Sequence, residues 1–395
     1  MMKTRPYQAL GSLSKFCRCC SQPLKWYKKP RRAWKECSKE ALLHNVATIQ
    51  SQLSSKTALM AVVKADAYGH GATYCSRLLE KNGVTIFAVA TLDEGIELRK
   101  AGIRGDILIF GYTAPEDVDK IQHFDLIQTI ISEQYGLALE QTGIRIRCHL
   151  KIDTGMHRVG IPKKKLGTII HFYRSAILVV EGIYSHLGSA DSLDEFAIER
   201  TEAQITAYNE VLAQLRKAGI DPLRTHLQSS YGLQNYKDLQ YDYVRIGISL
   251  YGCQSEVSDM PLPLRPVLSL KSRIALIEYV AEDDFIGYGN DVMAPHKMKI
   301  AMIPIGYADG IPRDLSSADL QVSISGVAVP AVGRICMDMM MLDVTNLPNT
   351  KVGTEVTLID RMDASFSAEI LASKAGTITN EVLSRLGKRL PVIYK

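Results

Sequence analysis

Short apolar runs that alternate with amphipathic helical patterns over residues 38–246 constrain the fold of this chain more than any other feature. Strands that alternate with helices pair in parallel through right-handed crossovers. About eight such units predict an α/β protein with a TIM-type (β/α)8 barrel, in which chemistry takes place at the carboxyl ends of the strands. The expected barrel strands are 58–64, 85–90, 106–110, 126–131, 146–152, 178–184, 224–228 and 243–246.

The pattern changes after Pro261-Leu262-Pro263, where runs such as 266–280 and 355–359 alternate or become rich in β-forming residues. Turns that contain glycine, or asparagine and proline, separate these runs, which is typical of a β domain. Two short helices, near 367–372 and 378–386, are expected to close it. The chain therefore divides into a basic N-terminal extension (1–31), the barrel (32–260) and a mostly β C-terminal domain (261–395).

The basic extension holds eight lysines and arginines and no acidic residue, and so accounts for the positive net charge of the chain, which is +5. It lacks the apolar core of a secretory signal, so a plain tail is favoured over a surface-binding patch or the cytoplasmic flank of a membrane segment. Membrane contact is expected only through this extension. The protein is expected to be cytoplasmic or to be the soluble part of a membrane-anchored protein. The near-neutral remainder argues against nucleic acid as a partner. Cys17, Cys19 and Cys20 lack the additional nearby ligands of a zinc site, and no metal is expected.

Lys64 lies at the carboxyl end of an expected barrel strand, where catalytic residues of such barrels are found. The run VVKADAYGHG places Lys64 at the end of an apolar strand, just before a small-residue turn. Burial disfavours the charged amine, and a neutral lysine amine can condense with an aldehyde. The alternative is a solvated lysine that emerges where the strand ends.

The same run resembles the pyridoxal phosphate (PLP) segment of alanine racemases, in which Lys64 would hold the cofactor and Tyr68 would bind its phosphate. The run KIDTGMHRVG resembles the family's KxDTGMxRxG segment. By that match, Arg158 would contact the cofactor's ring oxygen and the substrate carboxylate, and Lys151 falls where many members carry a carbamylated lysine. Without the match, Arg158 would be read as a surface ion pair.

Three further segments extend the resemblance along the predicted barrel. Ser230 matches a phosphate-binding serine, and the run RIGISLYG resembles the family's RxGIxLYG, whose Gly247 and Ile248 would cradle phosphate. His186 would support the arginine that faces the pyridine nitrogen, although a lone histidine is more often structural. That arginine is Arg245, and an arginine is a poor proton donor because the pKa of a guanidinium is very high. A weak electron sink suits reversible proton exchange better than decarboxylation or transamination.

The predicted β domain carries the second half of the expected site. Tyr288, in the run IGYG, resembles the family's second base, although a structural hairpin tyrosine would fit the residues alone. Two bases on opposite faces satisfy racemisation, with Lys64 serving the D-amino acid and Tyr288 the L-amino acid. By match, Tyr307 would line the entrance and Met337 would offer its backbone N–H to the substrate carboxylate. Because Tyr288 would reach in from the other subunit, the resemblance implies a homodimer with shared active sites.

Asn380 departs from the family, whose members usually have a phosphate-site tyrosine there, and Ser229 replaces a common asparagine. In this position the chain resembles the serine-racemising branch associated with vancomycin resistance. The alternative is that Asn380 only restores a contact with the phosphate, which would leave alanine as the preferred substrate. The expected activity is therefore PLP-dependent racemisation of alanine, which would supply D-alanine for peptidoglycan, with serine racemisation as the alternative. A decarboxylase of the same architecture is disfavoured by Arg245, and a non-catalytic PLP carrier is disfavoured by the second domain.

Overall fold

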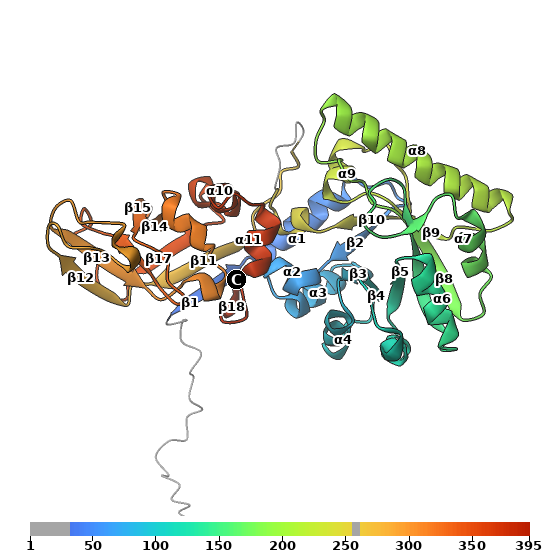
Figure 1. Ribbon diagram of the computed structural model, residues 1–395, viewed down its shortest axis with the longest axis horizontal. Coiled ribbons are helices and arrows are strands. Elements are labelled where there is room, and N and C mark those ends of the chain that lie inside the picture. The colour runs from blue at the N-terminus through green and yellow to red at the C-terminus, as the bar shows by residue number, and fades with distance from the viewer. Residues whose placement is uncertain (1–31, 255–260) are drawn as a thin grey trace, which may run out of the picture.

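The computed structural model describes residues 32–254 and 261–395 (Figure 1). The basic extension at 1–31, with Cys17, Cys19 and Cys20, lies outside the described residues. None of the helices in the described part of the chain combines the length and apolar character that crossing a membrane requires.

Eight parallel strands close into the predicted TIM-type barrel. Their order along the sheet is β5-β4-β3-β2-β10-β9-β8-β6, and β5 also pairs with β6, so the sheet has no free edge there. A ninth, two-residue strand, β7 (Ile161–Pro162), pairs with β6. The barrel strands are β2 (Ala58–Val62), β3 (Ile86–Val89), β4 (Asp106–Ile109), β5 (Ile127–Ile130), β6 (Ile146–Asp153), β8 (Leu178–Tyr184), β9 (Arg224–His226) and β10 (Tyr243–Ile246).

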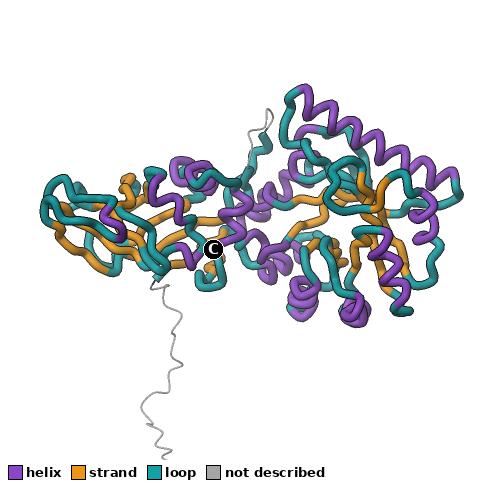
Figure 2. The backbone as a smooth tube through the Cα atoms, viewed as in Figure 1, coloured by secondary structure: helices purple, strands orange, loops and turns teal. Residues whose placement is uncertain are grey.

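Helices cover the outside of the barrel (Figure 2), and several begin at a side chain that caps the first turn. The Ser38 side chain accepts a hydrogen bond from the Ala41 N–H, and Thr91 forms a capping box with Glu94. Such caps satisfy backbone donors that the first helical turn leaves unpaired. The helices are α1 (Lys39–Gln50), α3 (Ala72–Lys81), α4 (Leu92–Lys100), α5 (Val118–His123), α6 (Glu133–Gln141), α7 (Leu166–Tyr173), α8 (Glu195–Lys217) and α9 (Ser230–Asn235).

The second domain is a mostly antiparallel sheet, ordered β12-β13-β16-β15-β14-β17-β11-β1-β18, with two short helices beside it. Helix α11 lies between this sheet and the barrel in Figure 1 and packs against the segment that begins at Lys64. The domain's elements are β11 (Leu268–Arg273), β12 (Leu276–Val280), β13 (Met298–Ile303), β14 (Gln321–Ile324), β15 (Val327–Val332), β16 (Met340–Asp343), β17 (Glu355–Ile359), α10 (Ala368–Lys374) and α11 (Thr379–Arg385).

Two strands of this sheet were not expected from the sequence. β1 (Ala33–Cys37) pairs antiparallel with β11 and parallel with β18 (Val392–Tyr394). A barrel that starts at residue 32 is therefore wrong for these first residues, which belong to the second sheet. The alternation that marks a half-buried strand is missing from β1 because its residues, Lys35 among them, are buried on both faces.

The segment after β2 is a left-handed helical turn, α2 (Lys64–Tyr68). Ala65, Asp66, Ala67 and Tyr68 all have φ between +52° and +55°, a conformation that costs about 1–2 kcal/mol per non-glycine residue. Two carboxylates hold it. Glu94 accepts from the Ala65 N–H at 2.6 Å, and Asp66 accepts from the Ala72 N–H at 2.8 Å. The strained turn carries both Lys64 and Tyr68, so its geometry sets their positions.

Gly69 ends this turn, and replacing it with alanine is expected to destabilise the fold strongly. Its φ is +78°, and an added Cβ would lie 2.3 Å from the Leu383 carbonyl oxygen of α11. Gly83 is a matched control, because its φ is +90° and an added Cβ would meet no atom within 4 Å. Gly83→Ala should cost about 1–2 kcal/mol from backbone strain alone, whereas Gly69→Ala should cost at least about 3 kcal/mol. Equal losses in denaturant unfolding would contradict this packing.

Candidate active site

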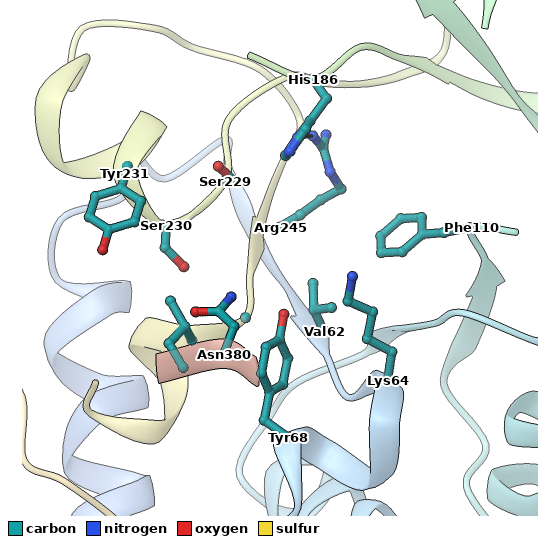
Figure 3. A pocket seen from close by; sticks show the side chains of 12 residues that line it. Val62, Lys64, Tyr68, Phe110, His186, Ser229, Ser230, Tyr231, Arg245 and Asn380 are labelled. Carbon is teal, nitrogen blue, oxygen red and sulfur yellow. Dashed lines mark hydrogen bonds between the residues drawn. The ribbon is translucent and has the colours of Figure 1, made fainter. Parts of the chain in front are cut away.

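A cavity of about 260 Å³ opens where the barrel strands end (Figure 3). Its size is near the lower end of small-molecule sites. It brings together eight of the residues predicted from the sequence, contributed by β-strand ends, the left-handed turn and α11. They are Lys64, Tyr68, His186, Ser230, Arg245, Gly247, Ile248 and Asn380, with Val62, Phe110, Ser229 and Tyr231 completing the wall.

One end of the cavity has the shape of a cradle for an anionic group. A Cβ on Gly247 would lie 2.5 Å from the Tyr68 hydroxyl oxygen, so only glycine leaves room there. Burial raises the pKa of Tyr68 to about 12, which keeps the phenol protonated and able to donate a hydrogen bond. In Figure 3, Ser230 and Asn380 lie on the same side of the cavity as Tyr68.

The Lys64 side chain extends into the cavity beside Phe110 (Figure 3). Burial lowers the pKa of its amine, and the nearby positive charge of Arg158 lowers it further. Both effects favour the neutral amine, which is the nucleophilic form. Lys64 therefore has the protonation tendency that the sequence analysis expected of a lysine at this strand end.

Arg245 reaches the cavity from β10 and is held entirely by neutral acceptors. It donates to the carbonyl oxygens of Ser185 and Leu227 at 2.8 and 2.9 Å. It also contacts Nδ1 of His226 at 3.0 Å and Nδ1 of His186 at 3.1 Å. Within residues 32–254 and 261–395, no carboxylate forms an ion pair with it. Burial lowers the pKa of Arg245 to about 10, so the guanidinium stays charged at neutral pH.

His226 is a site residue that the sequence analysis missed. Burial and the adjacent Arg245 keep its pKa well below the usual range, so the ring is neutral. Its Nδ1 accepts from Arg245, which places its proton on Nε2, and Nε2 lies 2.9 Å from Nδ1 of His149. His149 is also neutral, its pKa lowered to about 3 by burial. The sequence offered one signal for this pair: His149 and His226 each stand in an otherwise strand-like run, CHL and RTH respectively.

Arg158 lies beside the main cavity in a neighbouring hollow lined by residues such as Asp153 and His157. It is close enough for its charge to lower the pKa of Lys64, of His186 and of Lys151. Lys151 is buried and donates to the Ile152 carbonyl oxygen at 2.8 Å. Burial, followed by the charge of Arg245, lowers its pKa to about 7. The neutral amine is the form able to react with carbon dioxide, as the resemblance suggested for this position.

Besides Arg158, three predicted residues do not line the barrel cavity within one chain. Tyr288, Tyr307 and Met337 lie on the surface of the second domain, where they are between 40% and 68% exposed. Tyr288, at 68% exposure, begins a short 3-10 turn between β12 and β13. The single chain therefore assembles the Lys64 half of the expected site and presents the Tyr288 half separately on its surface.

Comparison with known proteins identifies the family to which both domains belong. The alanine racemase N-terminal domain matches residues 37–255, and the alanine racemase C-terminal domain matches residues 267–394. The chain belongs to the alanine racemase family. Alanine racemase from Clostridium difficile 630 superposes with a TM-score of 0.87 at 34% identity, over 93% of this chain and 97% of that chain. Family and fold thus confirm the predicted two-domain architecture.

Curated relatives include a serine/alanine racemase from Enterococcus gallinarum, 43% identical over 92% of this chain. Alanine racemase 1 from Caldanaerobacter subterraneus subsp. tengcongensis is 37% identical over 90% of this chain and 92% of its own length. The chain spans about half the length, 52%, of the Enterococcus gallinarum relative. It likewise spans about half of two amino-acid racemases from Enterococcus faecalis.

The depressed pKa of Lys151 predicts a specific pH dependence of stability. Between its folded value of about 7 and its ordinary value of 10.5, the unfolded chain binds a proton at Lys151 that the folded chain does not. The free energy of unfolding contributed by this group therefore rises with pH in that window and is lowest below it. Lys151→Met should remove this slope when denaturant unfolding is measured across the window in buffer free of carbon dioxide. Parallel pH profiles for the two proteins would contradict the assignment.

Proposed function

We propose that this chain is the catalytic part of a PLP-dependent racemase of small amino acids, with alanine as the first substrate. The observation that carries the proposal is the convergence of Lys64, Tyr68, Arg245 and the Gly247 cradle in one cavity at the ends of the barrel strands. Sites at this end of the barrel are typical of TIM-type enzymes. The chain's membership of the alanine racemase family supports the same reaction.

The residues that line the cavity suit the phosphate, the aldehyde and the ring nitrogen of PLP. The space above Gly247, which a Cβ would fill, suits the phosphate, with Tyr68 as a hydroxyl donor. Lys64 suits the aldehyde because its amine is biased toward the neutral form. Arg245 suits the ring nitrogen because it is a buried donor of fixed orientation. When bound, PLP supplies an electron sink that weakens the Cα–H bond of the amino acid.

Arg245 favours racemisation over other reactions of such a cofactor. His186 and His226 are neutral, and each accepts a hydrogen bond from Arg245 at Nδ1. Its guanidinium is therefore held in place and, with a pKa of about 10, stays protonated at neutral pH. A ring nitrogen that receives no proton withdraws less charge from Cα, which favours return of a proton there. A decarboxylase of the same architecture remains disfavoured for this reason.

Racemisation also needs acid–base groups on both faces of Cα. We propose Lys64 on one face, for the D-amino acid, and Tyr288 from a second copy of the chain on the other, for the L-amino acid. The exposure of Tyr288 and its position outside its own chain's cavity support this assignment. The functional unit is then an isologous homodimer with shared active sites. Arg158, Tyr307 and the Met337 backbone would bind the substrate at this junction.

Asn380 supports serine as a second candidate substrate. It lines the cavity on the side of Tyr68 and Ser230, where a tyrosine is usual in the family. Its amide leaves more space than a phenol and offers both donor and acceptor groups to a substrate hydroxyl. The Enterococcus gallinarum relative is named a serine/alanine racemase.

As an alanine racemase in the cytoplasm, the protein would supply D-alanine for peptidoglycan.

Deuterium incorporation at Cα, measured in D2O with L-alanine and L-serine separately, tests the reaction and its substrate together. We expect exchange with alanine, and lack of exchange with both amino acids would contradict the racemase proposal. If Asn380 admits serine, Asn380→Tyr should lower the ratio of serine to alanine exchange by about tenfold or more, because the phenol fills the added space. An unchanged ratio would remove Asn380 as the determinant of substrate choice.

Tyr288→Phe tests the two-base arrangement. We expect conversion of L- to D-alanine to fall by about 100-fold or more, because one proton-transfer group is lost. Exchange of the Cα proton of D-alanine should persist, since Lys64 still serves that face. Tyr279→Phe is the matched control, because Tyr279 is 67% exposed and lies on the same domain. Equal loss of exchange from both enantiomers in Tyr288→Phe would contradict the assignment of faces.

A further inference from the structure

Lys35 is a buried cation whose partners belong to two elements of the candidate site. It sits in the middle of β1 and is 1% exposed. Its Nζ donates to the Gly69 carbonyl oxygen at 2.6 Å and to the Leu386 carbonyl oxygen at 3.2 Å. Among the ion pairs of the described residues, none involves Lys35. The ammonium group is therefore committed to two backbone carbonyls.

These two carbonyls end the elements that carry the walls of the phosphate cradle. Gly69 follows the left-handed turn that bears Lys64 and Tyr68. Leu386 is the C-terminal cap of α11, which bears Asn380. The turn and α11 touch without spare room, since an added Cβ on Gly69 would lie 2.3 Å from the Leu383 carbonyl oxygen. One side chain thus joins the two elements just behind the cavity.

The left-handed turn needs such external support. Its four consecutive non-glycine residues with positive φ are a conformation that the isolated chain avoids. Strained backbone persists only where its surroundings hold it in place. A methionine at position 35 would have similar length without the cost of burying an amine, but it would leave both carbonyls without this donor. The same burial lowers the pKa of Lys35.

We propose that Lys35 is a positioning residue for the cofactor phosphate. By tying the turn to α11, it fixes the separation of Tyr68 and Asn380 and holds the turn in its binding geometry before the cofactor arrives. The inference rests on the proposed PLP site. Lys35 lies on β1, a strand of the second domain, and does not line the cavity. The proposal therefore gives it a role in cofactor binding that acts through the turn and α11.

Lys35→Met tests the proposal through two readouts other than activity. In the apoprotein, amide hydrogen exchange across residues 65–71 should become faster than in the wild type, because the turn loses its support. Equilibrium titration of the apoprotein with PLP should give a Kd about tenfold higher. Lys35→Gln, which is shorter and cannot serve both carbonyls equally, should shift both readouts in the same direction if Lys35→Met does not fold.

Lys299→Met is the matched control. Lys299 is 9% exposed, and its Nζ donates to the carbonyl oxygens of Leu347, Pro348 and Thr350 at 3.3, 3.0 and 2.9 Å, within the second domain. Both methionine variants should lose stability, but only Lys35→Met should alter the turn and the PLP affinity.

Equal PLP affinity in Lys35→Met and wild type, or an equal loss in Lys299→Met, would overturn the proposal. If the wild type itself does not bind PLP, the proposed function fails. The exchange rates of the turn then still decide whether Lys35 supports it: unchanged rates would overturn that role as well.

Discussion

The contact between the left-handed turn and α11 is the constraint on which the rest of the site depends. The turn places Lys64 and Tyr68, and α11 places Asn380 in the same cavity. Gly69 allows the two to touch, and Lys35 joins their ends through hydrogen bonds. A strained backbone is thus maintained by packing and donors from both domains. The barrel alone does not provide these partners, because β1 and α11 belong to the second domain.

The electrostatics of the cavity follow from burial more than from ion pairing. Arg245 is a charged group surrounded by carbonyl oxygens and neutral imidazoles. Its positive charge, together with burial, keeps His186 and His226 unprotonated. Burial, followed by the charge of Arg158 for Lys64 and of Arg245 for Lys151, biases these two lysines toward the neutral amine. A cavity of this kind attracts an anionic ligand while keeping its nucleophile reactive.

Much of the architecture was predictable because the periodicities are strong and the motifs are local. The barrel strands and the two late helices follow from the spacing of apolar residues. β1 and β18 were missed because strands of five and three residues carry little pattern, and in β1 the buried Lys35 interrupts the apolar run. His226 was missed for a similar reason, since a histidine in a three-residue strand has many structural explanations.

The sequence by itself determined the two-domain order, the family and most residues of the barrel cavity, because each motif lies at the end of one strand or turn. The tertiary structure alone showed that the Lys64 turn is left-handed and that it is held from the second domain. It also showed that Arg245 is surrounded by neutral acceptors, and that Tyr288 lies outside the cavity of its own chain. These properties depend on contacts between residues far apart in sequence, which local spacing and propensity do not specify.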